Sequence, residues 1–203
     1  MTPTFLVRMC PVRPVRFLAA VLLWTPFALP AEQVKVTLDP AHSTVEWTLD
    51  ATMHTVHGTF KLRSGTIIFD PATGVGNGEF VIDATSAETG NSSRDKTMHK
   101  EVLETKRYPE ITFLPKRVLG KLPPEGNFTL QVEGAFHIHG ATHEVTLTIP
   151  VQRTGDTVQL SSDFVVPYHD WGMKNPSNFF LHVSNQVQVK ITATGQLTLT
   201  AGH

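Results

Sequence analysis

Apolar and polar residues alternate along most of the chain after residue 33, and this pattern is the strongest constraint on the fold. It is clearest between residues 127 and 140, where one face carries Phe128, Leu130, Val132, Phe136 and Ile138. Residues 143–151 and 185–200 repeat it, with Val, Leu and Ile set against Thr, Glu, Gln and Lys. A two-residue period is typical of β-strands that bury one face.

Further segments with this pattern bring the prediction to about eight to ten strands, with only one convincing helix. One short helix cannot cover the apolar faces of so many strands, so the sheet must cover itself. A closed barrel and a two-sheet sandwich both satisfy this requirement, and short links such as Gly140-Ala141 indicate antiparallel neighbours. We favour an all-β antiparallel barrel of about eight strands, because closure also removes exposed sheet edges.

Residues 92–113, SSRDKTMHKEVLETKRYPEITF, interrupt the alternation and predict the helix. Asp95 falls in its first turn, where a negative charge suits the helix dipole, and Pro109 returns the chain to an extended conformation. A narrow apolar stripe follows at helical spacing, formed by Met98, Val102 and Leu103. We expect one short helix that caps an end of the barrel as a lid.

The first 31 residues differ from the rest of the chain. Three arginines precede the apolar run FLAAVLLWTPFALPA at 17–31, and no acidic residue appears before Glu32. This layout is typical of a secretory signal peptide, with an uncleaved membrane anchor as the alternative. We therefore expect a signal peptide at 1–31, one β-barrel domain at 32–203 and a periplasmic location.

Charge and cysteine content exclude several classes of function for the mature chain. Cys10, the only cysteine, would be removed with the signal, so no disulfide or thiolate site remains. The loss of three arginines leaves 14 of the 17 basic residues against 18 acidic ones, a formal charge of −4. Without a basic cluster interleaved with aromatic residues, we expect no nucleic-acid partner.

Catalytic motifs are absent from the sequence. It contains no Gly-x-Ser-x-Gly, no His-Glu-x-x-His and no phosphate-binding glycine loop. A hydrolase would have to use a site such as His42-Ser43 with Arg94-Asp95, but neighbouring residues of a strand point to opposite faces. We therefore expect a protein that is not an enzyme and that needs no cofactor.

A cluster of histidines offers an alternative function. His137, His139 and His143 lie close together in the sequence. A two-residue turn at Gly140-Ala141 would pair Ile138 with His143, which turns His143 inward and the other two outward. The three rings then do not converge, so we assign no metal ligands. A periplasmic metal-binding protein that uses the His137/His139/His143 region is kept as the alternative.

The interior of the predicted barrel carries many aromatic side chains. Barrels of about eight strands are either filled by side chains or surround a small ligand. The sequence pattern alone does not decide between a filled interior and a ligand cavity. The aromatic side chains on the apolar faces are Trp47, Phe60, Phe69, Phe80, Phe113, Phe128, Phe136 and Phe164.

Four stretches resemble the motifs of a known family. They are LDPAHSTVEWTL (38–49), HGTFKLRSGTIIFD (57–70), RDKTMHKEVLETKRYPEITF (94–113) and HIHGATHEVTLTIPV (137–151). In this order they resemble the YceI-like, polyisoprenoid-binding, lipocalin-like proteins, over nearly all of residues 34–200. The most specific part is Arg-Asp followed by a helical stretch and Tyr-Pro-x-Ile-x-Phe. The resemblance implies an extended antiparallel barrel whose apolar lumen holds a long isoprenoid or a comparable lipid chain.

Carried over by matching position, the resemblance also implies site residues. It places in the lumen Trp47, Phe60, Phe69, Phe80, Ile82, Phe113, Phe128, Phe136, Ile138 and Val145, to which the apolar-face pattern adds Phe164. Near the lid it places Arg94, Asp95 and Met98, beside Val102 and Leu103. The sequence departs from the family pattern at His143-Glu144 and in a longer, more aromatic segment at 168–180.

Together these observations predict an exported lipid-binding protein. We expect it to hold an isoprenoid, such as a quinone tail, or a similar apolar chain, for transport, storage or stress protection. The expected partner is this lipid, and transient contact with a membrane and a homodimer are further hypotheses.

Overall fold

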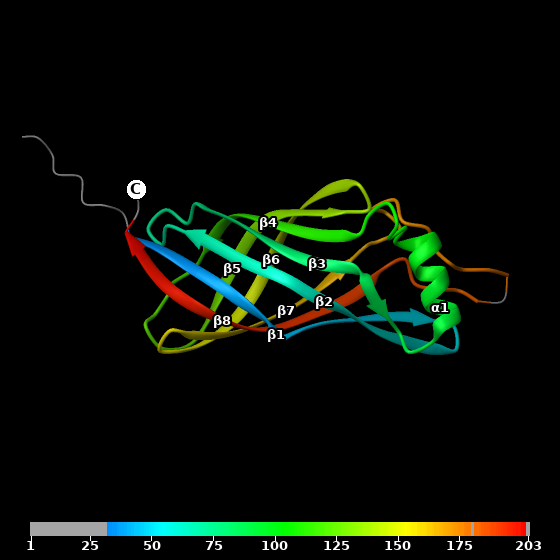
Figure 1. Cartoon of the computed structure of the whole chain (residues 1–203), viewed down its shortest axis with the longest axis horizontal. Helices are drawn as coiled ribbons and strands as arrows, with labels where there is room; N and C mark the ends of the chain where they lie inside the picture. The colour runs from blue at the N-terminus through cyan, green and yellow to red at the C-terminus, as the bar shows by residue number, and fades with distance from the viewer. Residues whose placement is uncertain (1–31, 180, 202–203) are drawn as a thin grey trace, which may run out of the picture.

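The eight strands of the protein close into one antiparallel barrel (Figure 1). The computed structural model describes residues 32–179 and 181–201, so the expected signal peptide at 1–31 lies outside the described residues. Neighbouring strands follow the chain order and β8 pairs with β1. The strands are β1 (Glu32–Ala51), β2 (His54–Phe69), β3 (Gly76–Glu88), β4 (Glu110–Leu119), β5 (Gly126–Ile138), β6 (Ala141–Thr154), β7 (Thr157–Val166) and β8 (Val187–Ala201). The predicted all-β antiparallel barrel is confirmed.

Bulges explain why the structure has eight strands and not ten. The sequence alternates separately over residues 34–39 and 44–50, but both segments belong to one strand, β1, whose register with β8 shifts between Asp39 and Ser43. Asp39 stabilises this irregularity, because its carboxylate accepts from the Ala41 N–H at 2.9 Å and its carbonyl accepts from the Ser43 hydroxyl at 2.6 Å. A second shift between Leu62 and Ser64 bends β2 in the same way. Such bulges increase local twist and let long strands wrap around a barrel.

The least exposed core residues lie towards one end of the barrel, which we call the closed end. There β1 begins and β8 finishes, and Val34, Ala193 and Leu197 are each only 1% exposed. At the opposite end, which we call the lid end, a helix crosses the barrel and a long loop projects beyond it (Figure 1). The expected placement of one short helix over an end of the barrel is confirmed.

The helix is built from two consecutive segments. It consists of α1 (Ser92–Thr97) and a π-helical turn η1 (Met98–Val102). The side chain of Asn91 caps its start by accepting from the N–H groups of Ser93 and Arg94, both at 3.1 Å. Within the described residues, no helix has both the length and the apolar character needed to cross a membrane.

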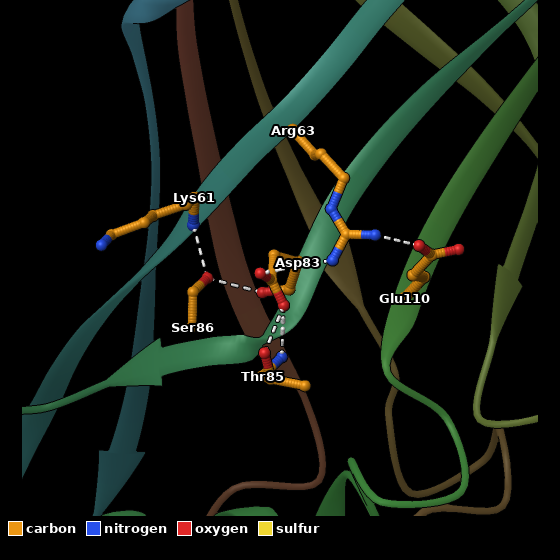
Figure 2. Close-up of polar contacts among 6 residues, drawn as sticks. All are labelled: Lys61, Arg63, Asp83, Thr85, Ser86 and Glu110. Atoms are coloured by element: carbon orange, nitrogen blue, oxygen red, sulfur yellow. Dashed lines mark hydrogen bonds and ion pairs between the residues drawn. The ribbon is translucent and has the colours of Figure 1, made fainter.

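A polar cluster on the outer face of β2, β3 and β4 sets the point at which the chain leaves the sheet for the helix (Figure 2). Arg63 reaches both Glu110 and, at 3.3 Å, Asp83. The Ser86 hydroxyl donates to the Asp83 carbonyl at 2.6 Å and accepts from the Lys61 N–H at 2.8 Å, in place of a strand-to-strand bond. The end of β3 is thereby tied to its neighbours just before the helix begins.

Candidate functional site

A cavity of about 520 Å³ occupies the lid-end half of the barrel. This volume is typical of pockets that hold small organic ligands. Its wall is almost entirely apolar, and the strands contribute Val45, Trp47, Leu49, Ala51, Val56, Phe60, Ile82, Ile111, Phe136, Ile138, Phe164, Val166, Val187 and Val189. The polar lining residues belong to the segments around the mouth, and they are His54, Asn91, Ser93, Arg94, Thr97 and Tyr168.

A glycine leaves room for the largest side chain of the wall. Trp47 on β1 pairs with Gly58 on β2, and the indole ring lies over the glycine. A Cβ atom at Gly58 would lie 2.2 Å from Cζ2 of Trp47 and 2.7 Å from the Glu88 carbonyl oxygen. The ring therefore packs flat against the wall only because residue 58 has no side chain. Its Nε1–H is buried, and no described group accepts a hydrogen bond from it.

Aromatic rings separate the cavity from the filled closed end. Phe136 lines the cavity, and its ring centroid lies 4.9 Å from that of Phe113 and 5.6 Å from that of Phe164. Phe113 in turn lies 6.1 Å from Phe80. Offset and tilted contacts of this kind are favourable beyond the area that they bury. This layer of rings makes the floor of the cavity.

The helix contributes one side of the mouth. Met98, Val102 and Leu103 line the cavity, and Arg94 lies beside them. The Arg94 guanidinium is held by two bonds to Thr89, from Nε to the hydroxyl at 2.8 Å and from Nη2 to the carbonyl at 3.1 Å. The guanidinium is thus a cation with a defined orientation at the edge of an apolar cavity.

The loop between β7 and β8, described at residues 167–179 and 181–186, contributes the other side of the mouth. Its inner residues Tyr168 and Met173 are 5% and 2% exposed. The Tyr168 hydroxyl donates to the Ser184 carbonyl at 2.7 Å, and burial raises the pKa of this phenol to about 12. An ion pair between Lys174 and Glu101, at 2.5 Å, joins the loop to the helix. We call residues 167–179 and 181–186 the lid loop.

The lid loop also covers a gap in the barrel wall. Strands β6 and β7 pair only near the closed end, from Val151–Leu160 to Thr154–Thr157. Towards the lid end they separate, and Trp171 of the lid loop stacks on His143 of β6, with ring centroids 4.1 Å apart and planes at 5°. Burial lowers the pKa of His143 below its usual range. The neutral imidazole is therefore favoured. The two stacked rings cover the gap between β6 and β7, which we call the seam.

The structure places six of the eleven predicted lumen residues in the cavity lining: Trp47, Phe60, Ile82, Phe136, Ile138 and Phe164. The other five, which are Phe69, Phe80, Phe113, Phe128 and Val145, do not border this cavity. These five pack in or against the core. The physical reason is depth, since alternation selects the inward face of a strand but not the level along the barrel at which a side chain points inward.

Of the residues predicted near the lid, most line the cavity and one does not. Arg94, Met98, Val102 and Leu103 line the cavity, but Asp95 does not. The Asp95 carboxylate instead accepts from the backbone N–H and the hydroxyl of Thr89, at 3.0 and 2.5 Å, and so supports the residue that orients Arg94. Sequence reasoning missed the contribution of the lid loop, which is Tyr168, Trp171, Met173, Pro176, Leu181 and Val183. The density of aromatic residues in YHDWGMKNPSNFF was the available signal.

The histidines of the alternative metal function do not converge. His137 bonds Thr142 at 2.8 Å, whereas His139 lies in the turn beside Tyr108, with ring centroids 4.7 Å apart. His143 lies opposite Phe136 on the inner face, so its predicted inward direction is confirmed although the pairing with Ile138 is wrong. Within the described residues, no group of three His, Cys, Asp or Glu side chains could hold a metal ion.

The suggested hydrolase site is not assembled either. His42 lies in the irregular segment of β1 and bonds the Asp39 carboxylate at 2.7 Å. Asp95 lies on the helix and bonds Thr89. The two side chains are thus held by different partners on different elements.

Comparison with solved structures shows the same fold in other proteins. A polyisoprenoid-binding domain from Saccharophagus degradans is 18% identical, with a TM-score of 0.65, over 80% of this chain and 98% of that one. BcnA from Burkholderia cenocepacia is 21% identical, with a TM-score of 0.64, over 77% of this chain and 98% of that one.

Sequence comparison points to one family. A UPF0312 protein from Vibrio parahaemolyticus is 25% identical over 131 residues, which cover 63% of this chain and 67% of the relative. The YceI-like domain matches residues 36–195, a span that runs from β1 to β8 and includes the helix and the lid loop. The resemblance seen in the four sequence motifs is confirmed, and the chain belongs to the YceI-like domain family.

Proposed function

We propose that this protein binds an isoprenoid or another long apolar chain in the lid-end cavity. The observation that carries the proposal is the lining, which is apolar along the strands and polar only around the mouth. Such a site matches a ligand with a long hydrocarbon body and one polar end. The structural neighbour from Saccharophagus degradans, a polyisoprenoid-binding domain, supports this class of ligand.

The apolar contact supplies enough free energy for binding without any charge. Removal of apolar surface from water contributes about 25 cal/mol per Å². A chain that buries ~400 Å² would gain on the order of 10 kcal/mol before the costs of association. The proposed role is therefore binding, for transport, storage or stress protection, and not catalysis. Export to the periplasm remains part of the proposal, on the basis of residues 1–31.

Direct analysis of bound lipid tests the proposal. Protein expressed from the full chain is purified without detergent and examined by native mass spectrometry, before and after incubation with geranylgeraniol. We expect a co-purifying lipid or stoichiometric uptake of the prenol. If the protein carries no lipid and takes up no prenol, the proposal is wrong.

A pair of neighbouring substitutions locates the binding site. Val189 lines the cavity, whereas Val165 on the adjacent strand β7 is 50% exposed and does not. Val189→Trp should fill part of the cavity and reduce prenol uptake at least tenfold, and Val165→Trp should leave uptake unchanged. Equal uptake by the two variants would contradict binding in the cavity.

The polar end of the ligand is proposed to lie beside Arg94. A guanidinium held at the mouth can donate to an oxygen of the ligand head group, and a charged acceptor gains more than a neutral one. Arg94→Gln should weaken binding of geranylgeranyl phosphate more than binding of geranylgeraniol. Lys96→Gln is the matched control, because Lys96 is exposed on the same helix and does not line the cavity.

A further inference from the structure

Two large hydrophobic side chains are almost fully exposed at the lid end. Met53, in the turn between β1 and β2, is 89% exposed, and Phe179, in the lid loop, is 90% exposed. The other exposed large hydrophobic residues among those described, Val75, Val165 and Leu199, are 50–61% exposed. Exposed apolar side chains that gather at one place on the surface mark sites of contact with a protein, a ligand or a membrane.

The structure joins the two segments into one rim. The Thr52 N–H donates to the His182 carbonyl at 2.9 Å, and the His182 N–H donates to the Thr52 hydroxyl at 2.9 Å. An isolated bridge pairs Ala51 with Val183, and the Ser184 N–H donates to the Asp50 carbonyl at 2.8 Å. We call residues 50–54 and 176–184, except residue 180, the apolar rim, and it is held as one unit.

The inner side of the apolar rim is part of the cavity wall. Ala51, His54, Pro176, Leu181 and Val183 all line the cavity. The segments that carry the exposed tips at Met53 and Phe179 therefore also line the mouth of the cavity.

The helix on the other side of the mouth adds positive charge. Lys96 and Lys100 are exposed there. The two acidic side chains of the helix are engaged elsewhere, since Asp95 accepts from Thr89 and Glu101 pairs with Lys174. Exposed lysines beside exposed apolar tips are the combination that favours the surface of a bilayer containing anionic lipids.

We propose that the lid end docks on a lipid bilayer, with Met53 and Phe179 inserted between the head groups and Lys96 and Lys100 against anionic lipids. The cavity mouth then faces the membrane, and the apolar chain passes between bilayer and barrel. This inference rests on the proposed function for its purpose, but it concerns a separate surface and can fail separately.

Flotation with lipid vesicles tests the docking. Vesicles are made of phosphatidylcholine alone or with phosphatidylglycerol, and the protein is expressed from the full chain. The double variant Met53→Ser/Phe179→Ser should lose membrane partitioning, by roughly tenfold for each side chain. Lys96→Gln/Lys100→Gln should lose mainly the preference for phosphatidylglycerol, by roughly fivefold for each lysine.

Leu199→Ser is the matched control, because Leu199 is 56% exposed on β8 near the closed end and should not contact the bilayer. If Leu199→Ser reduces flotation as much as the rim variants do, or if the rim variants float like the wild type, the proposal is overturned. It is also overturned if the rim variants only convert a dimer of this chain to a monomer and leave flotation unchanged.

Uptake of geranylgeraniol in the absence of vesicles separates the two proposals. We expect the rim variants to take up the prenol as the wild type does, while its transfer to and from vesicles slows. If the wild type does not take up geranylgeraniol, the proposed function is contradicted. If the variants take up the prenol normally and also transfer it to and from vesicles at the wild-type rate, only the docking is contradicted.

Discussion

The two ends of the barrel are built from the same alternating strands, yet one is filled and the other is hollow. At the closed end, Val34, Val158 and Leu197 are at most 2% exposed, and the strands pair on both sides. At the lid end, β6 and β7 separate, and the inward side chains surround a cavity of about 520 Å³. Where β6 and β7 are paired, the inward side chains fill the barrel. Where these two strands separate, the lid loop and the helix complete the wall.

The largest expected difference between the ends concerns the loss of a leucine. Leu197→Ala at the closed end should cost about 2–5 kcal/mol of unfolding free energy, because it leaves a void in a packed core. Leu103→Ala at the cavity wall should cost about 1 kcal/mol, since the side chain already borders open space. Urea unfolding of the two variants measures both values. Similar costs would mean that the two ends do not differ in packing.

A pair of glycines tests the same contrast by adding volume. A Cβ at Gly58 would collide with Trp47, and one at Gly65 would lie 2.7 Å from Cδ1 of Phe80. The unfolding free energy of both alanine variants should fall by about 1–3 kcal/mol, because the added methyl group overpacks its surroundings. Only Gly58→Ala should also reduce uptake of geranylgeraniol, because the displaced indole ring enters the cavity. If Gly65→Ala reduces uptake equally, the cavity is not confined to the lid-end half.

The seam at the lid end should respond to loss of its aromatic cover. Trp171→Ala removes the ring that stacks on His143, an interaction worth about 0.5–1.5 kcal/mol beyond its buried area. We expect a lower unfolding free energy and faster release of geranylgeraniol in a stopped-flow dilution. His143→Phe is the control, since it keeps a stacked pair and should release the prenol at nearly the wild-type rate.

The smallest effect is a pH dependence of stability at the same seam. Burial lowers the pKa of His143 in the folded protein, so the unfolded chain binds a proton first as the pH falls below about 6.5. Unfolding free energy should therefore decrease with falling pH between the unfolded and the folded pKa values of this histidine. His143→Phe should show a smaller decrease in thermal midpoint between neutral and mildly acidic buffer. An identical decrease would show that His143 makes no contribution to this pH dependence.

Much of the architecture could be predicted from the chain alone. The two-residue period identified the inward faces, and Trp47, Phe136 and Ile138 do line the cavity as expected. The turn between β5 and β6 was misplaced by one residue. It is formed by His139 and Gly140, with φ of 51° and 76°, and not by Gly140 and Ala141. A two-residue turn of this kind needs positive φ at both positions, which is uncommon for a residue other than glycine, so the pattern of glycines did not point to His139.

The sequence by itself determined which side chains point inward, since the period of a strand is a local property of the backbone. Only the tertiary structure decided which of them face open space. Phe113 and Phe136 share one pattern, but Phe136 borders the cavity and Phe113 lies behind it. That difference depends on where β6 and β7 separate and on how the lid loop places Trp171 over the gap. These are contacts between distant segments, which no local pattern encodes.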